Sequence, residues 1–232
     1  MESDTPMLID CSDYSFRYHR NAQALRQVNF VVRPGEHTAV LGLNGSGKST
    51  LLRSLVGLIR GEGTVRVLGM EVKKPNLREI RQRVGLVFQD PQIQLFCPTV
   101  IEDVAFGPIN LHGDANQARE EAEAALEAVG YTGGLFTACA DLSLGEMRKV
   151  ALAGVLVLQP DLLLLDEPDS FLDWDGKRRL IELLQSLEQI TRILVTHDME
   201  FASALCEQCL YLKQGTVLFH GSIAAFHRRI FS

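Results

Sequence analysis

The sequence lacks any apolar run long enough to cross a membrane. A spanning helix needs about 18 or more consecutive apolar residues, and the longest candidate, residues 150–158, ends before Pro160 and Asp161. The N-terminus, residues 1–4, is acidic and lacks the basic and apolar regions of a secretory signal. We therefore expect a cytosolic chain, in which any association with a membrane depends on partner proteins.

Positive charge and cysteine are also scarce. The 29 Asp and Glu outnumber the 23 Lys and Arg, for a net charge of -6. The basic footprint of a nucleic-acid-binding protein is missing, and we expect no nucleic-acid partner. The five cysteines are an odd number at wide spacing, which argues against a disulfide framework. Cys206 and Cys209 have the spacing of half a zinc site, but no second pair completes it, and we interpret both as small core residues.

Short apolar segments that alternate with helical ones make up most of the chain, and this alternation predicts a parallel α/β sheet. The first 40 residues are instead rich in aromatic and β-branched residues, which indicates an N-terminal antiparallel β region. Gln214 and Gly215 predict the turn of a late hairpin. The expected strands are 14–18, 28–32, 38–41, 64–68, 71–73, 84–88, 162–165, 193–196 and the two arms of a hairpin at 209–220.

The pattern changes after residue 90. Residues 90–112 contain three prolines and predict a loop with a short helix. Residues 115–129, rich in alanine and glutamate, predict a helix with a solvated face. The other expected helices begin at about Lys48 or span 143–158, 177–187 and 222–230. We expect one domain over residues 1–232, with a core formed by 1–89 and 151–232 and a helical subdomain at about 90–150.

Residues 42–49 match the phosphate-binding loop pattern G-x-x-x-x-G-K-[ST] in full. Glycines let backbone N–H groups surround phosphate oxygens, and the N-terminus of the following helix adds partial positive charge. Lys48 brings a full charge to the β- and γ-phosphates, and the Ser49 hydroxyl is a ligand for Mg²⁺. A chance glycine-rich turn is disfavoured because strand, loop and helix fall where the motif requires them. The candidate nucleotide-binding residues here are Gly42, Asn44, Gly45, Ser46, Gly47, Lys48, Ser49 and Thr50.

An apolar strand at 162–165 runs into Asp166 and Glu167, which is the Walker B pattern. Asp166 would hold Mg²⁺, directly or through water. Glu167 would be the general base that polarises the attacking water. Buried strands often end in acids, so the pattern is specific only because the phosphate-binding loop accompanies it.

Two further polar side chains follow apolar strands, Gln89 after residues 84–88 and His197 after residues 193–196. Ligands of parallel sheets bind at the carboxyl ends of the strands. A lone histidine is more often a surface or core residue, but this position favours a functional one. We therefore expect one nucleotide to meet the Lys48 loop, Gln89, Asp166, Glu167 and His197 together, with Glu167, His197 and Gln89 as the catalytic candidates.

Ser143 and Glu146 have the spacing of a capping box at the start of a helix. The same arrangement leaves a helix N-terminus whose donors could face an anion. Both interpretations can hold together.

With these motifs in this order, the chain resembles the ABC ATPase family over essentially its whole length. The resemblance implies a P-loop NTPase-type cassette that binds ATP and Mg²⁺ between two cassettes arranged head to tail, as a homodimer or a heterodimer. It also implies that Tyr18 stacks on adenine, that Gln89 joins Ser49 and Asp166 at the metal, and that Ser143, Gly145 and Asp173 are further nucleotide-binding residues. The motifs are the phosphate-binding loop 42–50, Gln89, the signature 142–146, the Walker B segment 162–167, the D-loop 170–173 and His197.

Within that family, residues 84–91, 94–96, 98–100 and 102–108 look like the energy-coupling-factor and cobalt-type importer ATPases. The resemblance implies uptake of transition metal ions or vitamins, powered from the cytoplasmic face of the cell membrane. It also implies that a polytopic membrane subunit docks near residues 89–108. We expect Phe96, Val100 and Phe106 to contribute apolar contact there, the alternative being that all three pack internally.

Three residues depart from the family pattern. Leu144 stands where glycine is usual, Glu146 where glutamine is common, and Asp169 where a small or hydroxyl residue is more usual. Other functions stay open at this point: another class of ABC importer or exporter, a non-transport ABC ATPase acting on DNA or ribosomes, and a nucleotide-dependent module without turnover. Glu167 and His197 argue against the last, and the modest insertion argues against the DNA- and ribosome-associated forms.

Overall fold

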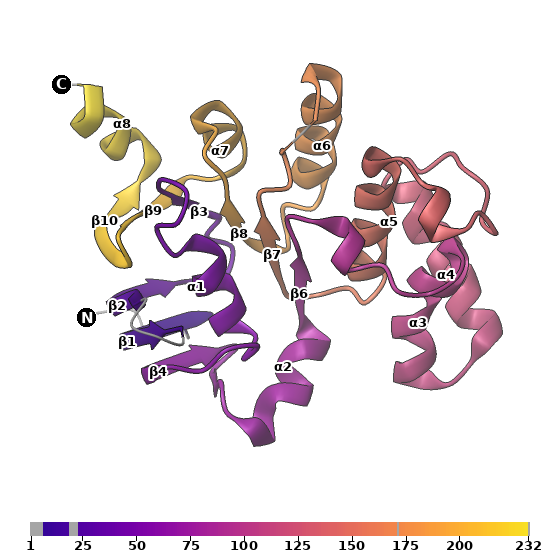
Figure 1. Ribbon diagram of the computed structural model, residues 1–232, viewed down its shortest axis with the longest axis horizontal. Helices are drawn as coiled ribbons and strands as arrows, with labels where there is room; N and C mark the ends of the chain where they lie inside the picture. Colours follow the sequence, from indigo (N-terminus) through magenta and orange to yellow (C-terminus); the bar gives the residue numbers. More distant parts are fainter. Residues whose placement is uncertain (1–6, 19–22, 171, 232) are drawn as a thin grey trace.

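The computed structural model describes residues 7–18, 23–170 and 172–231. Within these residues, six strands form the central sheet in the order β10-β9-β3-β8-β7-β6 (Figure 1). Strands β9, β3, β8, β7 and β6 run parallel to their neighbours, and β10 closes the edge as an antiparallel hairpin with β9. The strands are β3 Thr38–Leu41, β6 Val84–Val87, β7 Leu162–Asp166, β8 Thr191–Val195, β9 Gln208–Lys213 and β10 Thr216–Ser222.

The central strands are buried on both faces, as their continuous apolar composition predicts. Successive side chains point to opposite faces. Leu163 and Leu165 therefore join one hydrophobic cluster, whereas Leu162 and Leu164 join the other. The sheet is thus the layer that separates two cores.

An antiparallel sheet covers one of these faces, with α1 (Lys48–Leu55) packed beside it. Its strands are β1 Ile9–Arg17, β2 Gln23–Val32, β4 Glu62–Val67 and β5 Met70–Glu71, in the order β2-β1-β4-β5. Leu51, Leu52 and Leu55 of α1 are fully buried against it. The N-terminal antiparallel region predicted from β-branched composition is present, although its first two strands start earlier than expected.

A short helix, α2 (Leu77–Arg83), leads into β6 after the turn η1 (Lys74–Asn76). The sequence pattern does not predict α2. It presents one buried residue, Ile80, so it has no apolar stripe for a periodicity argument to find.

The other face is covered by helices that follow β6, β7, β8 and β10 (Figure 1). Buried side chains from α5, α6, α7 and α8 join Leu163 and Leu165 in one cluster. None of the helices in the described part of the chain is long and apolar enough to cross a membrane. The elements are η2 Pro91–Ile93, α3 Val100–His112, α4 Ala115–Ala128, η3 Cys139–Asp141, α5 Leu144–Leu156, α6 Trp174–Ser186, α7 Met199–Leu205 and α8 Ile223–Phe231.

Helix α3 corrects the prediction of a loop with a short helix at residues 90–112. It is 13 residues long and contains Pro108. Thr99 and Glu102 form a capping box at its start, and Gly113 ends it in the left-handed conformation. Pro108 removes one intrahelical donor, but capping and the burial of Val100, Ile101 and Val104 outweigh that loss.

Cys206 and Cys209 are buried, with 4% and 0% of their surface exposed. Burial raises the pKa of Cys209 to about 11 and that of Cys206 further, so neither thiol is ionised near neutral pH. Among the described residues, no group of three or more His, Cys, Asp or Glu side chains is placed to hold a metal ion. Both cysteines pack as small core residues, as expected.

Candidate active site

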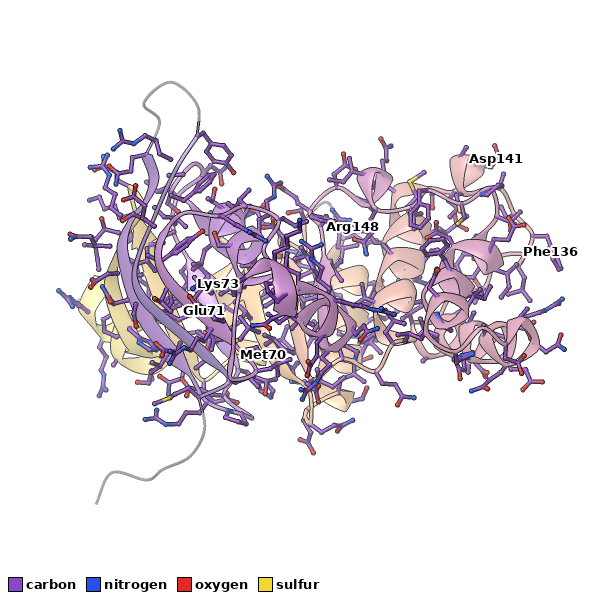
Figure 2. The ribbon with its side chains drawn as sticks, turned by 90° about the horizontal axis from the view of Figure 1, so that it is seen from below. Met70, Glu71, Lys73, Phe136, Asp141 and Arg148 are labelled. Carbon is purple, nitrogen blue, oxygen red and sulfur yellow. The ribbon has the colours of Figure 1, made fainter. Side chains whose placement is uncertain are left out.

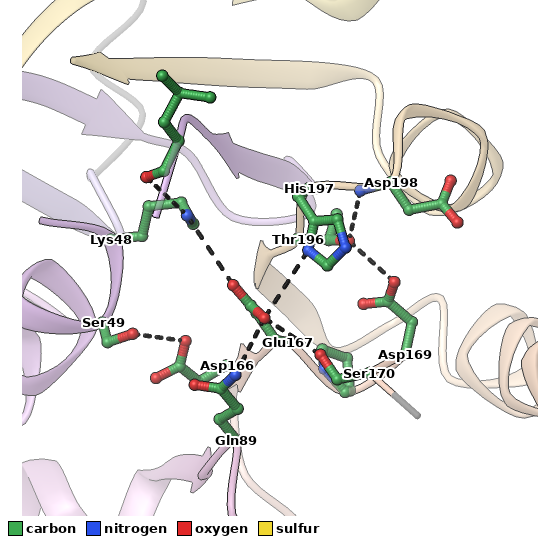
Figure 3. Close-up of polar contacts among 12 residues, drawn as sticks. Lys48, Ser49, Gln89, Asp166, Glu167, Asp169, Ser170, Thr196, His197 and Asp198 are labelled. Carbon is green, nitrogen blue, oxygen red and sulfur yellow. Dashed lines mark hydrogen bonds and ion pairs between the residues drawn. The ribbon is translucent and has the colours of Figure 1, made fainter. Parts of the chain in front are cut away.

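The carboxyl ends of β3, β8, β7 and β6 meet at one edge of the sheet, because these strands are parallel neighbours. Figure 3 shows the polar residues that follow them gathered around Glu167. The structure therefore brings together Lys48, Gln89, Asp166, Glu167 and His197, as the positions of their strands predict.

The phosphate-binding loop joins β3 to α1. Gly42 has φ 151° and Gly47 has φ 108°, and a Cβ at either position would collide with a backbone carbonyl of a neighbouring segment. Gly47 is also the N-cap of α1, so no side chain occupies the donors of the helix N-terminus. The first turn of α1 is therefore open to an anion.

Lys48 is only 5% exposed and its ammonium group points into the loop. Its Nζ donates hydrogen bonds to the carbonyl oxygens of Gly42 (2.8 Å) and Leu43 (3.2 Å), and lies 3.9 Å from Glu167 Oε1. A cation held by two carbonyls and one carboxylate is preorganised to meet phosphate charge. Ser46 and Thr50 are buried beside it, whereas Asn44 and Gly45 are exposed at the tip of the loop.

Ser49 and Asp166 face each other across the loop. Ser49 Oγ donates a hydrogen bond to Asp166 Oδ1 at 2.9 Å. Burial raises the pKa of Asp166, and the hydrogen bond from Ser49 works in the opposite direction. A hydroxyl and a carboxylate oxygen in contact are the hard ligands that Mg²⁺ prefers, so this pair fits a magnesium site.

Glu167 is the centre of the polar contacts in Figure 3. Its Oε2 accepts hydrogen bonds from Gln89 Nε2 and Ser170 Oγ, both at 3.1 Å, and lies 3.8 Å from His197 Nδ1. Glu167 has φ 46°, an uncommon value for a residue with a side chain, while its N–H donates to Val195 at 2.9 Å. The backbone strain turns the carboxylate out of the strand and into the site.

Ser170 is the contact that sequence reasoning missed. It lies three residues after Glu167, and its hydroxyl is one of the two donors to the Glu167 carboxylate. Its only sequence signal is its place in the D-loop segment, whose Phe171 is outside the described residues. Asp173 in the same segment caps α6 by accepting a hydrogen bond from the Gly176 N–H at 2.7 Å.

Tyr18 lies just beyond β1 and next to the phosphate-binding loop. Its hydroxyl is 3.3 Å from Thr50 Oγ1, and its ring meets Phe16 edge-to-face at 4.7 Å. The side chain is 40% exposed. Its aromatic surface is therefore accessible beside the residues that would hold phosphate.

The signature residues lie elsewhere. Ser143 and Glu146 form the predicted capping box, with Ser143 Oγ donating to Glu146 Oε2 at 2.6 Å. Figure 1 places α5, which begins with these residues, on the opposite side of β6 and β7 from α1. A Cβ added at Gly145 would meet nothing within 4 Å, and Leu144 is 39% exposed. Ser143 and Gly145 are thus open to a ligand, but this chain's own Lys48 is not beside them.

The apolar residues expected at a docking surface divide into two groups. Phe96 is 66% exposed and Phe106 47% exposed, and their rings meet edge-to-face at 4.8 Å. Val100 is fully buried, so the expectation that it contributes to this surface is wrong. As the first residue of α3, it points into the helical core rather than outward.

Comparisons with known proteins agree with this geometry. The family model described as ABC transporter matches residues 25–170. A Streptomyces coelicolor protein assigned as an ABC transporter ATP-binding protein is 44% identical over 223 residues, covering 96% of this chain and 85% of the relative. The energy-coupling factor transporter ATP-binding protein EcfA2 of Halalkalibacterium halodurans is 42% identical over 207 residues, covering 85% of this chain and 73% of the relative.

Solved structures show the same fold. The cbiO1 protein from Clostridium perfringens, described as part of the ABC transporter complex cbiONQ, has a TM-score of 0.84 at 31% identity, over 97% of this chain and 92% of that one. The dimeric ATP-binding cassette MJ0796, in a post-hydrolysis state bound to ADP and Pi, has a TM-score of 0.84 at 26% identity, over 93% and 98% of the two chains.

Proposed function

The chain belongs to the ABC transporter family, and from that premise we propose that it powers an energy-coupling-factor-type importer of transition metal ions or vitamins. It is an ATP-binding subunit with ATPase activity. The similarity to EcfA2 and to cbiO1 supports the narrower assignment. The observation that carries the chemistry is the cluster around Glu167 at the carboxyl edge of the sheet.

Lys48 and the N-terminus of α1 are proposed to hold the β- and γ-phosphates of ATP. Binding would exchange the Lys48 hydrogen bonds to the neutral carbonyls of Gly42 and Leu43 for bonds to phosphate, in which donor and acceptor are both charged. Tyr18 would stack on adenine, since its exposed ring lies next to Thr50. The remaining loop residues would contribute backbone N–H donors.

Ser49 and Asp166 would hold Mg²⁺, with Gln89 as the further ligand at the same edge. These residues would hold the ion next to the phosphate-binding loop, where it would supply positive charge to offset the charge of the phosphates. Burial raises the pKa of Asp166, and a bound cation would favour the charged form of this carboxylate, as the Ser49 hydrogen bond does.

Glu167 is proposed as the general base. Gln89 and Ser170 fix its Oε2, and Oε1 faces Lys48. A water on the γ-phosphate would give its proton to this carboxylate, and the two donors would keep the carboxylate aimed at that water. His197 lies 3.8 Å from Oε2 and is 62% exposed, so it can reach the phosphate from the open side.

A second cassette is proposed to complete the site, arranged head to tail. Ser143 and Gly145 are exposed and stand on the far side of β6 and β7 from this chain's phosphate-binding loop. A partner's nucleotide would reach them, and Asp173 would lie along the same contact. The helix N-terminus of α5 would then provide donors for the partner's γ-phosphate.

Residues 89–108 are proposed to dock on a polytopic membrane subunit at the cytoplasmic face of the cell membrane. Phe96 and Phe106 offer exposed aromatic surface on this segment. Gln89 connects the segment to Glu167, so closure at the nucleotide can move the docked partner.

The test is to co-express the chain with the polytopic membrane proteins encoded beside its gene and to reconstitute the purified complex in proteoliposomes. ATP-dependent uptake of a radiolabelled transition metal ion or vitamin, absent with the Lys48→Ala variant, would support the proposal. ATP-dependent transport of other solutes, or in the outward direction, would instead indicate another class of ABC transporter. Failure to join any membrane complex would favour a non-transport ABC ATPase.

A further inference from the structure

Asp169 is a buried carboxylate immediately behind the active site, in the segment between β7 and α6. It is 1% exposed, and its Oδ1 has no hydrogen-bond partner among the described residues. Burying a charge is costly unless other groups compensate for it.

One set of contacts links Asp169 to the residue before His197. Asp169 Oδ2 accepts a hydrogen bond from the Thr196 hydroxyl at 3.1 Å, and Thr196 is fully buried. The Thr196 hydroxyl oxygen also accepts a hydrogen bond from the Asp198 N–H at 3.0 Å. The loop that carries His197 is therefore held through a hydroxyl whose own orientation is set by Asp169 (Figure 3).

Lys177 on α6 links Asp169 to the other side of His197. Its Nζ donates to Asp198 Oδ2 at 2.7 Å and lies 3.8 Å from Asp169 Oδ2. Asp198 caps α7 through the N–H groups of Glu200 and Phe201. Both neighbours of His197 in the sequence are thus linked to the Asp169 carboxylate. Thr196 is linked by a hydrogen bond, and Asp198 is linked through Lys177, which lies near both carboxylates.

The segment that contains Asp169 is itself held in place. Arg148 on α5 donates hydrogen bonds to the carbonyl oxygens of Pro168 (3.3 Å) and Ser170. It therefore binds the backbone on both sides of Asp169. Burial lowers the pKa of Arg148, and the charge of Asp169 partly opposes that shift. Ser170 then donates to Glu167. Asp169 therefore lies in a segment that Arg148 holds by its backbone and that contacts the proposed base through Ser170.

The position of His197 depends on these contacts of its neighbours, because its own side chain is not fixed by burial. Its side chain is 62% exposed, and its Nδ1 lies 3.8 Å from Glu167 Oε2. We propose that Asp169 is a positioning residue for ATP hydrolysis, which fixes His197 beside Glu167 through the Thr196 hydroxyl and Lys177. The inference rests on the catalytic roles proposed above for Glu167 and His197.

The first test is steady-state ATPase turnover of the purified full chain with Asp169→Asn. Asparagine keeps the shape but leaves Lys177 and Arg148 facing a neutral group. Displacement of a catalytic group by about 1 Å costs roughly 10²-fold in rate, so we expect kcat to fall by roughly 10- to 100-fold while the Kd for Mg-ATP changes less than about twofold. The matched control is Asp161→Asn, which removes a carboxylate from an exposed ion pair with Arg83. It should leave both values unchanged.

The second test separates positioning from folding. Thr196→Val removes the hydroxyl and should reproduce the Asp169→Asn loss of turnover, whereas Thr196→Ser keeps the hydroxyl and should retain activity. This pair keeps the inference testable if Asp169→Asn does not fold. Equal turnover of the Val and Ser variants would overturn it.

The third test combines Asp169→Asn with His197→Ala. If Asp169 acts through His197, the second substitution adds little to the loss caused by the first, because both remove one coupled function. If the double variant instead loses turnover by the product of the two single-variant factors, the inference is overturned and Asp169 is a structural residue. Normal turnover of His197→Ala alone would instead refute the proposed role of His197, and with it the ground on which the inference rests.

Discussion

Phe96→Ala tests the docking surface on residues 89–108 by removing an aromatic side chain that contributes little to the stability of the isolated chain. Phe96 is 66% exposed, and its ring packs edge-to-face with the ring of Phe106, with centroids 4.8 Å apart. An aromatic pair is worth about 0.5–1.5 kcal/mol, and exposure places this pair at the low end. A loss of about 1 kcal/mol lowers the melting temperature of a chain this size by roughly 2–4 °C.

The effect on assembly should be much larger. Aromatic residues at the centre of an interface typically cost about 2 kcal/mol or more when truncated, which corresponds to roughly 30-fold in Kd. We therefore expect Phe96→Ala to weaken co-purification with the membrane subunit strongly while the free chain remains folded and binds Mg-ATP.

Phe136→Ala is the matched control. Phe136 is 67% exposed, lies outside residues 89–108, and packs under Arg119 at 5.3 Å. Figure 2 places it at the tip of the helical part of the molecule. Affinity capture of the membrane complex, with melting temperatures of the free variants, provides the comparison. Equal assembly of Phe96→Ala, Phe136→Ala and the wild type would refute docking at this surface.

Three further predictions concern the nucleotide and the signature. Lys48→Ala should abolish useful ATP binding, because charge-assisted hydrogen bonds of this kind contribute about 1.5–3 kcal/mol each, and unchanged Mg-ATP affinity in calorimetry would contradict it. Leu144→Gly should raise turnover in the assembled transporter by clearing the approach to a partner's γ-phosphate, at a helix-propensity cost of about 1 kcal/mol; a fall in both turnover and melting temperature would indicate packing instead. Because burial raises the pKa of Asp166 and Mg²⁺ binds its deprotonated form, Mg²⁺ affinity should fall as the pH is lowered toward that raised pKa. Calorimetric titrations of Mg²⁺ into the ATP-bound protein over a series of decreasing pH values, compared with Asp166→Asn, check this, and an identical pH dependence in the two proteins would refute it.

The reacting edge of the sheet is predictable from the sequence because each polar group follows a short apolar strand. Parallel neighbours place their carboxyl ends together, so Gln89, Asp166, Glu167 and His197 converge once the strands are recognised. In the sequence, these strands are marked by short continuous runs of apolar residues, which can be recognised from composition alone. The distances within the site are not predictable in this way.

The contacts behind the reacting groups depend on details that no local pattern contains. Ser170 reaches Glu167 because Glu167 adopts a positive φ, and Asp169 meets Thr196 across 27 residues of sequence. The sequence marks Asp169 as unusual but does not identify its partner. Likewise, the three prolines of residues 90–112 predicted a loop with a short helix, but the capping box and the buried side chains of α3 stabilise a helix of 13 residues there.

The central claim is that Glu167 activates water at a site that binds ATP independently of it. Phosphate release and Mg-ATP affinity of the wild type and Glu167→Gln, measured side by side on the same preparations, test it most directly. We predict equal affinity within about twofold, turnover lower by roughly 10²–10⁴-fold, the usual range for a lost general base, and accumulation of the variant as an ATP-bound dimer. Near-normal turnover of Glu167→Gln would contradict the account and show that another group positions the water.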